Sequence, residues 1–109
     1  MAWLSGWSYR KKITVSQLNV DSNLTDFPLY VNIAETGGGS TNIGANALTN
    51  GFDIRFTSSD GTTTLKYERE RYSITASNLT ADIWVKVPSI SGTVDTDIYI
   101  YYGNAGAAD

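Results

Sequence analysis

The chain has 109 residues, of which 41% are apolar and 17% are charged, and its formal net charge is −3. This length suits one packed domain and is too short for two. We therefore predict a single module over residues 1–109, with a folded part from about residue 7 to residue 104 and the start of a linker in residues 105–109.

Two missing residue types exclude whole classes of site. The sequence has no Cys and no His, which excludes disulfides, thiolate metal sites, and the commonest general base. The negative charge disfavours nucleic acid as a partner, because the basic run Arg10-Lys11-Lys12 would divide between the two faces of a strand. No apolar run approaches the roughly 20 residues that span a bilayer, so no membrane partner is expected.

The strand segments show alternation of apolar and polar residues, broken by turns rich in Gly, Asn, Asp and Ser. In chain order these segments are residues 7–15, 27–33, 52–57, 64–72, 81–87 and 97–102. Short alternating strands separated by turn signals predict an all-β fold, specifically an antiparallel β-sandwich with a jelly-roll-like topology. The irregular stretch 35–51 is expected to be a flexible loop, with one helical turn capped by Gly51 in its second half.

Aromatic side chains on the polar faces of the strands form the first candidate site. Alternation places Trp84, Tyr99 and Tyr101 opposite the β-branched core residues, and Tyr30 is a further aromatic residue on a polar face. Sugar rings have apolar C–H faces that stack on such rings, so these residues are candidate ligand contacts. The alternative is that the rings are buried in the sandwich or under its loops, and their exposure decides between the two.

A polar set provides the second candidate. Asp53 and Arg55 lie two residues apart in one strand segment, and Glu68 and Glu70 do so in another. A hairpin around residues 59–61 would bring the four side chains together. They would then either bind the hydroxyls of a sugar or form a salt-bridge ladder on an exposed face.

The same glutamate pair raises the question of catalysis. Residues at i and i+2 of a strand are about 6.5–7 Å apart, near the lower end of the carboxylate separation in inverting glycosidases. A catalytic acid needs a raised pKa, however, and Lys66, Arg69 and Arg71 lie close in the sequence. We therefore expect no enzyme activity.

Acidic turns raise the possibility of a metal. Asp95 and Asp97 lie beside a turn, and calcium prefers such oxygen ligands. Acidic turn residues also form local turns without any metal. We therefore expect no cofactor, and the one candidate is a structural calcium ion at these two residues.

Five motifs together resemble a known family. They are Trp7-x-Tyr9-Arg10-Lys11-Lys12-Ile13, Leu24-Thr-Asp-Phe-Pro28, Asp53-Ile-Arg-Phe56, Val85-Lys-Val-Pro88 and Ile98-Tyr-Ile-Tyr-Tyr-Gly-Asn104. Over nearly the whole chain they resemble DUF2341, a bacterial and phage domain of unknown function. The resemblance implies an accessory module of large extracellular or cell-envelope proteins, often beside lectin-like or immunoglobulin-like domains. It suggests carbohydrate binding by association and supplies no catalytic residues.

These observations lead to one leading function and one alternative. The leading function is non-catalytic binding of a polysaccharide or other glycan by a monomeric, extracellular or cell-surface module, covalently joined to neighbouring domains of a longer chain. Any secretion signal would then lie outside this sequence. The alternative is a structural or adhesive module of a surface or phage protein that interacts with proteins and has no sugar ligand.

Overall fold

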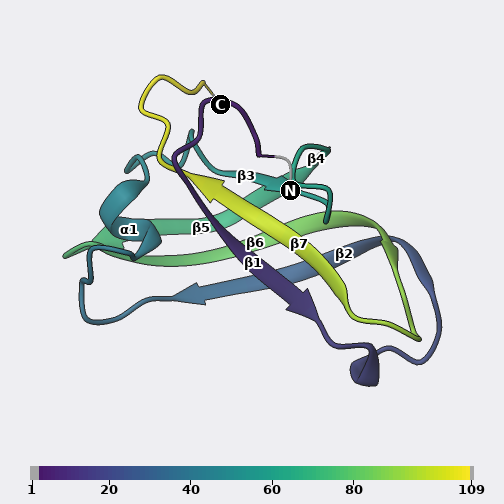
Figure 1. The fold of residues 1–109 in the computed structure, drawn as a ribbon. Helices are drawn as coiled ribbons and strands as arrows, with labels where there is room; N and C mark the ends of the chain where they lie inside the picture. Colours follow the sequence, from purple (N-terminus) through teal and green to yellow (C-terminus); the bar gives the residue numbers. More distant parts are fainter. Residues whose placement is uncertain (1–2, 109) are drawn as a thin grey trace.

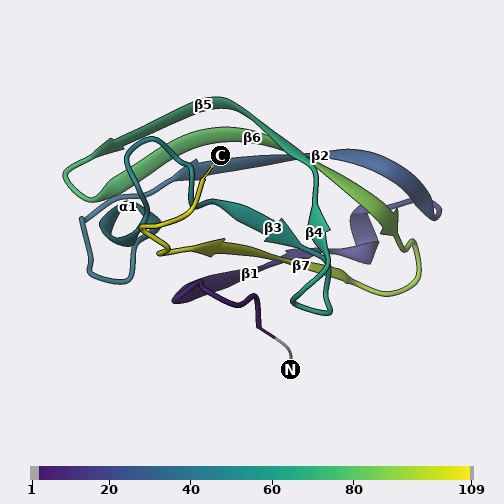
Figure 2. The same ribbon diagram turned by 90° about the horizontal axis from the view of Figure 1, so that it is seen from above.

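Two antiparallel sheets pack face to face in the computed structural model, which describes residues 3–108. One sheet has the order β1 (Tyr9–Val15), β7 (Thr96–Tyr102), β3 (Arg55–Thr57) and β4 (Thr64–Leu65); the other has the order β2 (Leu24–Ala34), β6 (Asn78–Ile90) and β5 (Tyr67–Thr75). The two layers are seen edge-on in Figure 2, and the path of the chain is seen in Figure 1. The predicted antiparallel β-sandwich is confirmed.

The chain crosses between the layers at most of its connections. It passes from β1 to β2 through the short 3-10 helix η1 (Gln17–Asn19) and from β2 to β3 through α1 (Ile43–Asn46), which lies at one end of the sandwich in Figures 1 and 2. Within residues 3–108, only the hairpins β3–β4 and β5–β6 stay within one sheet. The seven strands of residues 3–108 make a smaller sandwich than the eight-stranded jelly roll.

The core lies between the inner faces of the two sheets. Of the side chains that alternation assigns to the inner faces, those in or beside β3, β6 and β7 are almost fully buried: Ile54, Phe56, Ile83, Val85, Val87, Ile98, Ile100 and Tyr102. In β1 and β2, Val31 is buried, whereas Ile13, Val15, Leu29 and Ile33 are only partly buried. Burying one such side chain stabilises the fold by about 1.5–3 kcal/mol. Because successive strand residues point to opposite faces, this buried set fixes which residues face outward.

The long connection between β2 and β3 is tied to the sheet. The Glu35 carboxylate accepts hydrogen bonds from the backbone N–H groups of Ile43 (2.7 Å), Gly44 (2.9 Å) and Leu79 (2.9 Å). The sequence predicted a flexible loop here, and it did not predict that Glu35 would anchor this loop to the sheet. A helical turn is present in this connection, but it covers Ile43–Asn46 with Ala47 as its C-cap, so the predicted cap at Gly51 was wrong.

The predicted hairpin around residues 59–61 is present but short. Only Phe56 and Thr57 pair with Leu65 and Thr64, and after Leu65 the chain crosses to the other sheet. The expected strand 64–72 is therefore two strands in different layers. Among residues 3–108, no helix has the length and apolar character needed to cross a membrane.

Candidate functional site

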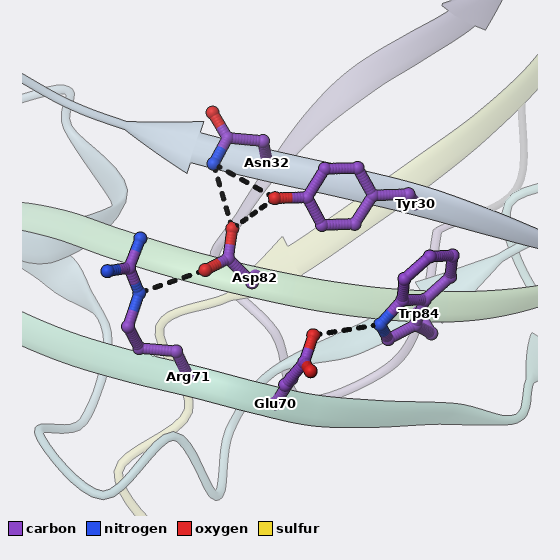
Figure 3. A network of polar contacts seen from close by, with 6 residues as sticks. All are labelled: Tyr30, Asn32, Glu70, Arg71, Asp82 and Trp84. Atoms are coloured by element: carbon purple, nitrogen blue, oxygen red, sulfur yellow. Dashed lines mark hydrogen bonds and ion pairs between the residues drawn. The ribbon is translucent and has the colours of Figure 1, made fainter.

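The outer face of the β2–β6–β5 sheet carries an exposed pair of aromatic rings. Trp84 in the central strand has Tyr30 of β2 as its direct cross-strand partner and Glu68 of β5 on its other side. Trp84 is 40% exposed and Tyr30 is 48% exposed. Their ring centroids are 5.0 Å apart and the planes are tilted by 38°, so the two rings form one continuous apolar surface (Figure 3).

A network of polar contacts fixes the tyrosine side of this pair. One Asp82 oxygen, Oδ1, accepts hydrogen bonds from the Tyr30 hydroxyl and from Asn32 Nδ2, the latter at 2.9 Å. The other oxygen, Oδ2, lies 2.9 Å from Arg71 Nε in an ion pair. These contacts come from three neighbouring strands, as Figure 3 shows. They hold the phenol ring in one orientation beside the indole.

A single carboxylate fixes the tryptophan side. The indole Nε1 of Trp84 donates a hydrogen bond of 3.0 Å to Glu70 Oε2. The register of β5 against β6 shifts between Arg69 and Arg71, which is the signature of a β-bulge. Bulges change which way the following side chains point. Here the shift lets both Glu70 and Arg71 lie on the outer face, where strict alternation would expose only one of them.

The hydrogen bonds of the network also set the charges of its members. The hydrogen bond from Tyr30 is the main cause that lowers the pKa of Asp82, followed by the bond from Asn32. The same hydrogen bond to Asp82 is the main cause that raises the pKa of Tyr30, because losing the phenol proton would place two negative charges side by side. At neutral pH, Asp82 is therefore ionised and Tyr30 is neutral.

A hollow of about 730 Å³ adjoins Trp84, and residues of both sheets line it. Trp84 forms part of its wall, and the side chains around it include Asp26, Glu68, Lys66 and Lys86. Small-ligand sites commonly have volumes of roughly 300–1,000 Å³. Its lining also includes apolar and aromatic side chains, among them Pro28, Leu65 and Tyr67. The exposed ring pair thus adjoins a hollow of mixed charged and apolar lining that is large enough for a small ligand.

Three of the predicted site residues, Trp84, Glu68 and Glu70, meet on this face. The placement of Tyr99 and Tyr101 in an exposed site was wrong, because they are only 7% and 0% exposed. Both lie in β7, in the other sheet. Residues before and within β1 cover them: the Trp3 ring packs edge-on against Tyr101, and the guanidinium of Arg10 in β1 lies 4.3 Å from the Tyr99 ring centroid.

The predicted cross-strand cluster does not form. Asp53 is fully buried, and its carboxylate accepts hydrogen bonds from the backbone N–H groups of Leu48 (3.0 Å), Gly103 (2.9 Å) and Asn104 (3.1 Å). Its role as a ligand contact was wrong, because these bonds join two loops. Glu68 and Glu70 lie in the other sheet because β5 belongs to the second layer.

Arg55, two residues after Asp53, also binds backbone groups of the protein itself. Its guanidinium donates hydrogen bonds to the carbonyl oxygens of Phe52 (2.7 Å), Ile54 (2.8 Å) and Ala108 (2.6 Å). A smaller hollow of about 410 Å³ lies beside it, lined also by Tyr67. Arg55 thus has carbonyl partners in place of the carboxylate partners expected for it.

The two aspartates proposed to bind calcium have protein partners. Asp95 accepts a hydrogen bond of 2.9 Å from the backbone N–H of Gln17, and Asp97 accepts one of 2.7 Å from the Thr14 hydroxyl. No group of three or more acidic side chains placed to hold a metal ion occurs within residues 3–108. Calcium at Asp95 and Asp97 stays a prediction.

Three members of the site did not appear among the sequence candidates: Asn32, Asp82 and Arg71. The alternation that exposes Trp84 also exposes Asp82 in the same strand, so the sequence pattern was sufficient to place Asp82 beside Trp84 on the outer face. Asn32 shares the outer face with Tyr30 for the same reason. The position of Arg71 on the outer face could not be predicted from alternation, because the β-bulge before it reverses the alternation.

A family model described as a domain of unknown function, DUF2341, matches residues 50–109. The match covers more than half of the sequence, and the chain belongs to this family. It includes β5 and β6, which carry Trp84, Glu70 and Asp82, whereas Tyr30 lies outside the matched residues. No curated protein and no solved structure matches the chain.

Proposed function

We propose that this member of the DUF2341 family is a non-catalytic carbohydrate-binding module that holds its ligand on Tyr30 and Trp84. The observation that carries the proposal is the exposed ring pair, with both polar ring atoms fixed by carboxylates on the same sheet face. In this proposal the module acts outside the cell as one part of a longer chain, and it binds a polysaccharide as a monomer.

Stacking is the main source of binding in this proposal. The apolar face of a sugar ring replaces water over the two aromatic rings, and aromatic side chains give a large contact area of fixed shape. Because hydrogen bonds already hold Tyr30 and Trp84 in place, little freedom remains to be lost on binding. Affinity at one such open site is expected to be weak, and repeated modules or repeated ligand units would raise it.

The charges around the rings support binding without catalysis. A general acid that works near neutral pH needs a raised pKa, whereas the hydrogen bonds to Asp82 lower its pKa. Glu70 is engaged with the Trp84 indole. Both carboxylates therefore position rings in this proposal, and the polar edges of the stacked sugar are left to Asn32 and Arg71.

Affinity electrophoresis tests the proposal. The purified domain is run through gels that contain one soluble neutral polysaccharide each, such as xylan, galactomannan or mixed-linkage β-glucan, beside Trp84→Ala and Tyr30→Ala. The matched control is Trp3→Ala, which removes an indole that is 45% exposed and packs against Tyr101 of the other sheet. Circular dichroism confirms that each variant folds.

The proposal predicts that at least one polysaccharide retards the domain and the Trp3→Ala variant, but neither site variant. Retardation that survives both site substitutions would move the binding site elsewhere on the molecule. Absence of retardation on every neutral polysaccharide would contradict the proposal and favour the structural or adhesive role.

A further inference from the structure

The hollow beside Trp84 contains four charged side chains that the protein itself does not use. Asp26, Glu68, Lys66 and Lys86 line it, and within residues 3–108 none of the four side chains makes a hydrogen bond or an ion pair with another protein group. Three other charged groups beside the aromatic pair, Glu70, Arg71 and Asp82, behave differently, because each is engaged with another of them or with a ring. The unused groups are therefore gathered at one end of the face.

Asp26 is unusual in its backbone as well. Its φ angle is +48°, in the left-handed region that non-glycine residues rarely adopt. It lies within the edge strand β2, between Thr25, which pairs with Ser89, and Phe27, which pairs with Val87. Unfavourable backbone conformations of this kind are concentrated at functional sites. Asp26, which has this backbone conformation, is one of the residues that line the hollow.

We infer that the hollow is a second subsite, contiguous with the aromatic pair, and that the ligand is therefore a chain segment of a neutral polysaccharide and not a single sugar. The inference rests on the proposed function. One sugar unit stacks on Tyr30 and Trp84, and the adjoining unit enters the hollow. There the carboxylates of Asp26 and Glu68 and the ammonium group of Lys86 bind its hydroxyls.

The mixture of charges selects the ligand class. A sugar hydroxyl both donates and accepts hydrogen bonds, so it is served by carboxylates, which only accept, and by ammonium groups, which only donate. An acidic glycan would bring its carboxylates against Asp26 and Glu68, and a basic one would meet Lys66 and Lys86. Two acids and two lysines around one hollow suit an uncharged chain. Trp84 belongs to both subsites, which makes the path continuous.

The dependence of affinity on chain length tests this inference. Oligosaccharides from the disaccharide to the hexasaccharide are prepared from a polysaccharide that retards the domain, and their affinities are measured by calorimetric titration. The variants are Asp26→Asn, which tolerates the left-handed backbone, and Lys86→Met, which keeps the apolar stem. Lys11→Met, an exposed lysine of β1 in the other sheet, is the control.

We expect affinity to rise with chain length. Each hollow variant should bind the longer oligosaccharides about tenfold more weakly, the effect of one lost hydrogen bond to a charged group, while binding of the disaccharide stays unchanged. Equal affinity for the disaccharide and the hexasaccharide, or hollow variants that match Lys11→Met on every length, would overturn the second subsite. In that case loss of binding in Trp84→Ala would still uphold the proposed function, so the two failures are distinguishable.

Discussion

Replacing the buried carboxylate of Asp53 by an amide should destabilise the fold severely. In Asp53→Asn the side chain keeps one acceptor oxygen where the native residue has two. One oxygen serves Leu48 and the other serves Gly103 and Asn104, so at least one buried N–H must then face the amide NH2 group. Losing a hydrogen bond to a charged acceptor and leaving its donor unsatisfied lowers the free energy of unfolding by about 2–4 kcal/mol.

Equilibrium unfolding in urea, followed by tryptophan fluorescence, measures this effect. With a slope of about 2 kcal/mol per molar urea, the midpoint should fall by roughly 1–2 M. Asp97→Asn is the matched control, because Asp97 accepts its hydrogen bond from Thr14 at an exposed position. Its change should stay within about 0.5 kcal/mol. Equal midpoints for the two variants would refute the assignment of Asp53 as the residue that joins the two loops.

Gly44→Ala should lower the free energy of unfolding by about 1–3 kcal/mol, because the new Cβ would lie 2.6 Å from backbone atoms of Asn78 and Leu79. Gly39→Ala, whose Cβ would have no contact closer than 3.8 Å, is the control in the same urea titration, and similar losses in both variants would contradict the close approach. The lowered pKa of Asp82 means that its network stabilises the fold above the unfolded pKa, which is roughly 3.9. That contribution is lost as the pH falls through the lower folded value. The difference in melting temperature between the native chain and Asp82→Asn should therefore shrink in acid, and a difference that does not vary with pH would refute this.

The alternation of residues 81–87 was sufficient to predict both the core and the outward position of Trp84. Its success has a physical cause: β6 is the central strand of its sheet, and one face is fully buried against the other layer. Such a strand cannot shift by one residue without burying the polar set. The β-sandwich follows from the same signal repeated in the other strands.

The failures occur where tertiary structure overrides that signal. Tyr101 is on the outer face of its sheet as alternation predicts, yet the N-terminal segment covers it. Asp53 precedes β3 and turns inward to bind loop N–H groups. The bulge at Glu70 changes which residues of β5 face outward. None of these events leaves a pattern in the local sequence.

The central claim is that Tyr30 and Trp84 form a sugar-binding surface. The most direct measurement is affinity electrophoresis of the native chain, Trp84→Ala and Trp3→Ala on one panel of neutral polysaccharides. The account predicts retardation of the native chain and of Trp3→Ala by at least one polysaccharide, and none for Trp84→Ala. Equal retardation of all three proteins, or no retardation of any, would contradict it.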